Sequence, residues 1–167
     1  VRNHRGVITV SSTPGKGSSF EVYLPAVSKA EAPEKENTQL LPTGKEHILF
    51  IDDETEMVTL GKEILEKLGY NVSSNTCPMK ALDAFRNSPE KYDLIITDMT
   101  MPNLTGEKLA KECLKIRPEI PIMLCTGFSN IISPQKAFDI GIKDFLIKPI
   151  SLKDLAISVR KVLDERQ

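Results

Sequence analysis

From His47 onward, candidate strands alternate with stretches of helical periodicity, and this alternation constrains the fold more than any other feature of the sequence. The candidate strands are short, and most are apolar with β-branched or aromatic residues. They span residues 47–51, 70–74, 93–97, 120–125 and 144–147. Strands separated by helices pair in parallel through right-handed crossovers. The pattern therefore predicts an α/β domain, with a parallel sheet covered by helices on both faces.

Two of the intervening stretches have the periodicity of amphipathic helices. Apolar residues recur at helical spacing over residues 57–68 and again over residues 152–163. Ser151, with Asp154 three residues later, resembles a capping box at the start of the second stretch. We therefore expect one helix soon after the first strand and a closing helix that begins just after Ser151.

The first 45 residues differ in composition and are predicted to be separate from the α/β domain. Residues 7–10 and 20–24 have the pattern of two strands, joined by the turn-forming residues 13–19. Residues 26–45 mix charge, proline and small residues without apolar periodicity, which is typical of a linker. We therefore divide the chain into a hairpin at 1–25, a linker at 26–45 and a domain at 46–167. An isolated two-stranded hairpin is marginally stable in water, so this one needs a partner surface.

Composition narrows the function classes. The 167 residues include 22 Lys and Arg against 23 Asp and Glu. This balance argues against a nucleic-acid or membrane-surface binder, which would carry a basic excess. No apolar run is long enough to span a bilayer, and the three cysteines form no metal-type spacing. We therefore expect a protein of the cytoplasm, and a chain that starts at Val1 without Met suggests a piece of a longer protein that could itself be anchored in a membrane.

Polar residues that could react or bind a ligand follow four of the five candidate strands. Asp52 and Asp53 follow the first strand, Asp98 the third, Thr126 the fourth and Lys148 the fifth. In an open α/β sheet the carboxyl ends of the strands form the ligand-binding edge. Each residue alone has an ordinary explanation: an aspartate caps a helix or turn, a threonine suits a strand, and a lysine before proline is solvated. Their joint placement at one edge favours an acidic site with a hydroxyl and an ammonium at its rim.

Three carboxylates at one edge repel one another unless a cation is present. Mg²⁺ suits such a site, because it needs only one or two carboxylates together with water and phosphate oxygens. A partly neutralised Asp98 could then attack a phosphoryl group and form an aspartyl phosphate. Lys148 could pair with Asp98 or with a phosphate oxygen, and the Thr126 hydroxyl could donate to another oxygen.

Four motifs together resemble the receiver domain of response regulators in two-component signalling. The resemblance covers about residues 46–165 and rests on FIDD at 50–53, DMTMPNLTG at 98–106, LCTG at 124–127 and FLIKP at 145–149. It implies a flavodoxin-like (βα)5 fold with strand order 2-1-3-4-5. It also implies that Asp98 is the phosphoacceptor, and that Asp52, Asp53, Asp98 and the backbone carbonyl of Thr100 hold Mg²⁺.

The same resemblance implies roles for three further residues. Thr126 matches the family's switch hydroxyl, Lys148 its lysine, and Phe145 the aromatic residue that changes rotamer on activation. A cis peptide bond between Lys148 and Pro149 is usual in the family. Phosphorylation of Asp98 would then draw in Thr126 and reposition Phe145, changing the face formed by the fourth helix, the fifth strand and the fifth helix.

The first 25 residues resemble the last hairpin of a histidine-kinase ATP-binding domain. The resemblance rests on the glycine-rich turn between two short strands at residues 6–25. The other nucleotide-binding motifs of that domain and its phosphorylated histidine are absent from the sequence. The segment around Lys16 also lacks the first glycine of a P-loop, so no ATP site is expected at Gly15 and Gly17.

These features lead to one functional hypothesis and two alternatives. We expect a receiver domain of a hybrid sensor histidine kinase, which takes phosphate from a phosphohistidine domain and passes it to water or to a histidine phosphotransfer protein. No DNA-binding output domain is expected after the closing helix. The first alternative is a receiver-like docking module that regulates a histidine kinase without phosphorylation. The second is a phosphatase or small nucleotide-binding enzyme, which is disfavoured because the first strand is followed neither by a glycine-rich loop nor by a D-x-D motif.

Overall fold

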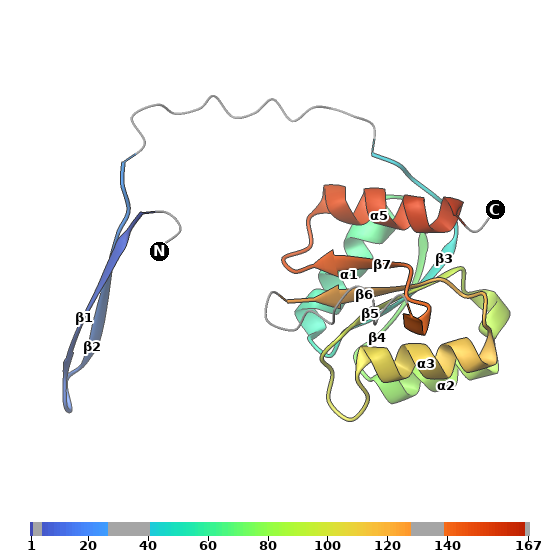
Figure 1. Ribbon diagram of the computed structural model, residues 1–167, viewed down its shortest axis with the longest axis horizontal. Coiled ribbons are helices and arrows are strands. Elements are labelled where there is room, and N and C mark those ends of the chain that lie inside the picture. The colour runs from blue at the N-terminus through green and yellow to red at the C-terminus, as the bar shows by residue number, and fades with distance from the viewer. Residues whose placement is uncertain (2–4, 27–40, 128–138, 166–167) are drawn as a thin grey trace. The chain divides into compact units, whose positions relative to one another are not determined.

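The computed structural model describes residues 1, 5–26, 41–127 and 139–165, which belong to two compact units, Val1–Gln39 and Leu40–Gln167 (Figure 1). The linker expected at 26–45 lies largely outside the described residues, and residues 128–138 lie wholly outside them. No helix in the described ranges is long and apolar enough to cross a membrane.

The first unit is an antiparallel hairpin of β1 (Val7–Thr13) and β2 (Gly17–Tyr23). Both strands are longer than the sequence predicted, because serine and threonine next to the turn continue the ladder. The Lys16 N–H donates to the Thr13 carbonyl at 2.9 Å, and Gly15 lies at φ +77°, as the third residue of a type II turn requires. Every residue of both strands is exposed, so the described part of this unit has no core of its own.

The second unit contains a five-stranded parallel sheet, as the sequence predicted. Its strands are β3 (His47–Ile51), β4 (Asn71–Asn75), β5 (Leu94–Asp98), β6 (Ile122–Thr126) and β7 (Asp144–Ile147). Their order across the sheet is β4-β3-β5-β6-β7, which is the expected order 2-1-3-4-5. The fold is therefore the flavodoxin-like α/β fold, with the first, third, fourth and fifth of these strands adjacent.

Helices cover both faces of this sheet (Figure 1). They are α1 (Thr55–Lys67), α2 (Pro78–Asn87), η2 (Pro89–Lys91), α3 (Gly106–Ile116) and α5 (Leu152–Asp164). Alternate residues of β3 point to opposite faces. Leu49 and Ile51 pack with α2 and α3, whereas Ile48 and Phe50 pack with α1 and α5. The sheet therefore has a separate apolar core on each face.

Most boundaries match the sequence predictions to within two residues. The β6 strand begins at Ile122 rather than Ile120, because Pro121 has no N–H to donate to the ladder. The closing helix begins as predicted, since the Ser151 side chain accepts a hydrogen bond from the Asp154 N–H at 3.0 Å. A proline thus sets the start of β6, and a serine cap sets the start of α5.

The amino end of β3 carries a titratable group, His47. Its Nε2 lies 2.9 Å from the Ser73 hydroxyl, and its ring meets the edge of Tyr92 with centroids 5.3 Å apart. Burial and the positive charge of Lys91 lower the pKa of His47 and outweigh Asp93, which raises it. The neutral imidazole is therefore the form that the folded state prefers.

The free energy of unfolding should consequently fall as His47 becomes protonated. Its folded-state pKa lies below its unfolded value of about 6.5, so the unfolded chain binds more protons in that window. The contribution of neutral His47 to stability is therefore fully present above about pH 6.5. It is lost as the pH falls toward the folded-state pKa of His47. Urea denaturation of wild type and His47→Gln at several pH values checks this. The difference in free energy of unfolding between the two proteins should narrow on acidification. A difference that does not change with pH would contradict the assignment to His47.

Candidate functional site

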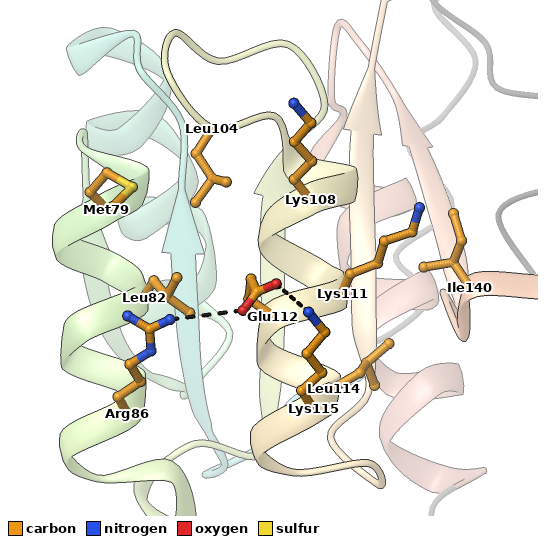
Figure 2. A pocket seen from close by; sticks show the side chains of 10 residues that line it. All are labelled: Met79, Leu82, Arg86, Leu104, Lys108, Lys111, Glu112, Leu114, Lys115 and Ile140. Atoms are coloured by element: carbon orange, nitrogen blue, oxygen red, sulfur yellow. Dashed lines mark hydrogen bonds and ion pairs between the residues drawn. The ribbon is translucent and has the colours of Figure 1, made fainter.

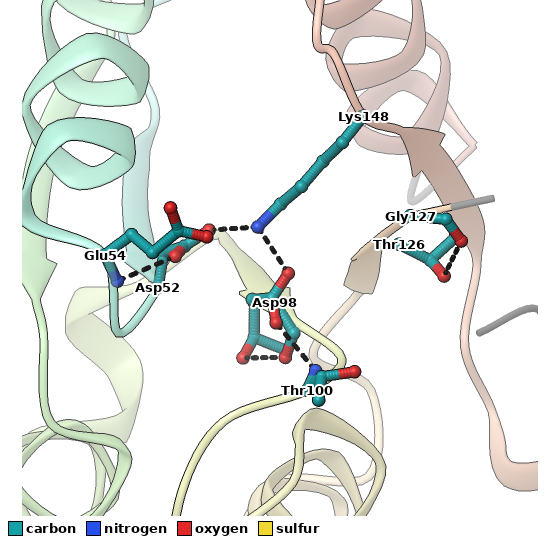
Figure 3. A network of polar contacts seen from close by, with 8 residues as sticks. Asp52, Glu54, Asp98, Thr100, Thr126, Gly127 and Lys148 are labelled. Atoms are coloured by element: carbon teal, nitrogen blue, oxygen red, sulfur yellow. Dashed lines mark hydrogen bonds and ion pairs between the residues drawn. The ribbon is translucent and has the colours of Figure 1, made fainter. Parts of the chain in front are cut away.

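The polar residues that the sequence singled out lie at the carboxyl edge of the sheet. Asp52 directly follows β3, Asp98 ends β5, Thr126 ends β6 and Lys148 directly follows β7. Because these strands are parallel and adjacent, their ends meet at one edge. Figure 3 shows the resulting network, with Lys148 reaching toward the two aspartates.

Lys148 joins the two buried carboxylates. Its Nζ lies 2.7 Å from Asp52 Oδ2 and 2.6 Å from Asp98 Oδ1. The side chains of Asp52 and Asp98 are only 1% and 8% exposed, and that of Lys148 is 20% exposed. The sequence predicted a pair between Lys148 and Asp98, which is present, but it put the ammonium at the rim of the site. The structure instead places the ammonium between the carboxylates, with Asp52 as a second partner.

This arrangement holds Lys148 in its charged form. Burial by itself lowers the pKa of Lys148, but the hydrogen bonds and negative charges of Asp52 and Asp98 outweigh it and raise the pKa above its ordinary value. One ammonium shared by two carboxylates leaves the group with a net negative charge. The site therefore still favours a further cation.

Backbone N–H groups fix the second oxygen of each carboxylate. Asp52 Oδ1 accepts a hydrogen bond from the Glu54 N–H at 3.0 Å, and Asp98 Oδ2 accepts one from the Thr100 N–H at 2.6 Å. Both donors lie two residues after the aspartate, in the turn that follows the strand. These turns fix the orientation of the two carboxylates.

For three other predicted residues the described contacts do not include Asp98. Thr126 is buried, and its hydroxyl donates to the Gly127 carbonyl at 3.2 Å. Asp53 is exposed, next to Asp52 in the chain. Phe145 is half-buried in β7 and packs against the core on the α2 and α3 face. The structure thus brings Asp52, Asp98 and Lys148 into direct contact, and it places the Thr126 hydroxyl at the adjacent strand end (Figure 3).

Comparison of the sequence with known families shows to which family the chain belongs. The sequence profile described as the response regulator receiver domain matches residues 48–160. The chain belongs to this receiver domain family. A receiver domain from Clostridium thermocellum has a similar structure, with a TM-score of 0.69 and 30% identity over 72% of this chain and 96% of that one. A CheY-like receiver domain protein from Methanospirillum hungatei has a TM-score of 0.68 and 26% identity over 74% of this chain and 97% of that one.

Several longer relatives of this receiver domain are sensor proteins. The aerobic respiration control sensor protein ArcB of Escherichia coli is 30% identical over 166 residues, which cover 98% of this chain and 21% of that protein. The sensor kinase CckA of Brucella abortus is 26% identical over 99% of this chain and 18% of that protein. The chain therefore spans about a fifth of the length of these relatives.

Receiver domains generally bind Mg²⁺, and the donor set here suits that ion. Within the described ranges no three His, Cys, Asp or Glu side chains gather into a metal cage. Two buried carboxylates, Asp52 and Asp98, do converge on one cation, the Lys148 ammonium. Mg²⁺ is usually held by one or two carboxylates and keeps several waters, whereas a cage metal needs more protein ligands. Asp52 and Asp98 thus fit Mg²⁺ better than a metal held by protein ligands alone.

Sequence reasoning missed the close approach of Gly106 to the backbone of this receiver site. Gly106 is the first residue of α3, and its N–H donates to the Met99 carbonyl at 3.0 Å. A Cβ at this position would collide with the backbone carbonyl oxygen of Asp98. Only glycine therefore lets α3 begin this close to the aspartate. A glycine directly after the N-cap residue Thr105 was the available signal.

The peptide bond between Lys148 and Pro149 is cis, as the resemblance to receiver domains implied.

Proposed function

We propose that this receiver domain takes a phosphoryl group from a phosphohistidine onto Asp98. The observation that supports this most is the setting of the Asp98 carboxylate. It is buried at the carboxyl edge of the sheet, and its two oxygens are held by the Lys148 ammonium and by the Thr100 N–H. A carboxylate oxygen of Asp98 would attack phosphorus as the P–N bond breaks, and the imidazole nitrogen would leave with the bonding electrons. Phosphoryl transfer asks mainly for positioning and charge stabilisation, and these neighbours supply both.

The neighbouring residues have distinct proposed roles. Lys148 would pair with an oxygen of the incoming phosphoryl group, since its ammonium already contacts the attacking carboxylate. Asp52, Asp53, Asp98 and the backbone carbonyl of Thr100 would hold Mg²⁺. When bound, Mg²⁺ supplies positive charge to the phosphoryl oxygens. The Thr126 hydroxyl would exchange its bond to the Gly127 carbonyl for one to the phosphoryl group, and Phe145 would repack in response.

The proposed parent protein is a hybrid sensor histidine kinase. The matches to sensor proteins extend over nearly the whole chain, 98% for ArcB and 91% for EvgS of Escherichia coli. The match to the transcriptional regulatory protein ZraR covers only 70% of the chain. The additional match includes residues before the receiver domain, which supports reading the β1 and β2 hairpin as the end of a kinase ATP-binding domain. The partners would then be a phosphohistidine domain of that kinase and a histidine phosphotransfer protein.

The test is the mass of the intact protein after incubation with acetyl phosphate and Mg²⁺. Wild type should gain one phosphoryl group, and a chelator should prevent the gain. Asp98→Asn should gain none, because an amide is a poor nucleophile. Asp144→Asn is the matched control, because Asp144 begins β7 and so lies at the end of this strand that is remote from the site. This variant should be phosphorylated like wild type.

Two results would contradict the proposal. Uptake of phosphate by Asp98→Asn at the wild-type level would assign the reaction to another residue. No adduct on wild type from acetyl phosphate or from a phosphorylated histidine domain would favour the non-phosphorylated docking module instead.

A further inference from the structure

A trough of about 630 Å³ runs along α2 and α3, on the helices that cover one face of the sheet (Figure 2). Its lining includes residues of α2, of α3 and of the loop that precedes α3. The trough contains none of the residues assigned to the phosphoryl-transfer site, so that function leaves it unexplained.

The floor of the trough is apolar. Leu82 is buried between the helices, Met79 is 46% exposed, and Leu104 lies across the gap between α2 and α3 in Figure 2. Leu114 and Ile140 are half-buried and extend the apolar lining on the other side of α3. One exposed methionine beside half-buried leucine and isoleucine side chains in a concave surface is typical of a binding site for apolar groups.

The rim of the trough carries more basic than acidic side chains. Arg86, Lys108, Lys111 and Lys115 line it, against the single carboxylate of Glu112. This excess does not reflect the chain as a whole, whose net charge is −1. The three lysines recur at spacings of three and four residues and therefore form one stripe along α3.

The cations of the rim are unevenly neutralised. Glu112 pairs with Lys115 at 2.6 Å and with Arg86 at 3.8 Å, and Arg86 pairs also with Asp83 at 3.5 Å. Lys111 pairs with Glu107 at 2.7 Å. Among the described residues no carboxylate pairs with Lys108, at the end nearest the loop before α3 (Figure 2). Positive charge is thus left over where the apolar floor is open.

We propose that this trough binds an acidic amphipathic helix of a partner protein. Two helices side by side present a groove into which the ridge of a third helix packs. Leucine-type side chains of the partner would cover Met79 and Leu104, and its flanking carboxylates would face Lys108 and Lys111. The charge complementarity would also steer the partner to this face.

The probe is a synthetic peptide of about 18 residues, long enough to form a helix, with leucine at positions i, i+4 and i+7 and glutamate on both flanks. It is titrated into the ¹⁵N-labelled full chain, and amide shifts are recorded. The shifts should map to α2, α3 and the loop that precedes α3. Raising NaCl from about 0.05 M to about 0.5 M should weaken binding, because it screens exposed charges. A scrambled peptide of the same composition should bind at least severalfold more weakly, since its leucines no longer share one face.

Two variants separate the charge from the apolar contact. Lys108→Glu and Met79→Ser should each weaken binding by about fivefold, as expected for the loss of one exposed charge contact or one apolar contact. Lys153→Glu is the matched control, because Lys153 is also an exposed lysine without a described ion pair but lies on α5. It should bind the peptide like wild type. Thermal unfolding of all three variants shows whether the fold is intact.

Four outcomes would overturn the proposal. The first is no binding of the peptide at millimolar concentration. The second is an equal affinity of wild type and Lys108→Glu for the peptide. The third is a set of amide shifts that maps to α1 and α5. The fourth is that vesicles of anionic lipid bind through Lys108 while the peptide does not, which would assign the surface to a membrane.

Discussion

Replacing Lys148 with methionine should lower the free energy of unfolding by about 3 kcal/mol at neutral pH. The Lys148 ammonium is within 2.7 Å of both Asp52 and Asp98, and these carboxylates are almost completely buried. Methionine keeps much of the apolar stem but leaves two buried negative charges facing each other. Because the lost interaction is buried, its cost exceeds that of a surface ion pair, which is about 1 kcal/mol or less. Urea denaturation of the two proteins measures the difference.

A double substitution tests whether the loss arises from the carboxylates. Asp52→Asn combined with Lys148→Met should be more stable than Lys148→Met alone, since one of the two unpaired charges is gone. Lys153→Met is the control, because this exposed lysine has no described ion pair and its loss should change stability by less than about 0.5 kcal/mol. If Lys148→Met cost no more than Lys153→Met, the bridging ammonium would have no structural role.

Mg²⁺ should stabilise Lys148→Met more than wild type. In wild type the ammonium already occupies the position between Asp52 and Asp98, so a divalent cation has to compete with it. In the variant the two carboxylates have no other cation. A ligand that binds only the folded state raises its stability in proportion to the logarithm of its concentration over Kd. Unfolding curves with Mg²⁺ and with chelator measure this difference.

Replacing Gly106 with alanine should destabilise the fold by about 2–3 kcal/mol and slow phosphoryl uptake at Asp98. The added Cβ would collide with the backbone oxygen of Asp98 and lie 3.1 Å from Met99 Cα. Alanine gains helix propensity of about 1 kcal/mol, but a clash with backbone atoms cannot be relieved by a rotamer change. Either α3 or the end of β5 therefore has to move, and the carboxylate of Asp98 moves with it.

Gly127→Ala is the control for this substitution. Among the described residues no atom lies within 4 Å of the position that its Cβ would take, so its stability should stay within about 0.5 kcal/mol of wild type. Denaturant unfolding measures the stability of both variants, and the rate of the acetyl phosphate reaction reports the position of Asp98. If Gly106→Ala unfolded like Gly127→Ala, the close approach of α3 to Asp98 would not limit stability.

The order of the elements and the edge at which the site lies follow from the amino-acid sequence alone. Parallel strands separated by helices align their carboxyl ends, so Asp52, Asp98, Thr126 and Lys148 had to lie at one edge of the sheet. The start of α5 was also predictable, because the cap at Ser151 acts over three residues. These features depend on local patterns or on topology, and both can be read along the chain.

The contacts between side chains, in contrast, depend on the packed structure. Lys148 and Asp52 are 96 residues apart, and their contact depends on the geometry of the turns that follow two different strands. Arg117 is likewise buried, and its Nη1 donates to the carbonyls of Pro89 and Tyr92 at 2.8 Å, which no sequence pattern indicated. The approach of Gly106 to Asp98 and the cationic trough along α2 and α3 also require the packed helices. Periodicity fixes which face of an element is buried, but side-chain contacts depend on distances of a few ångströms between elements that are far apart in the sequence.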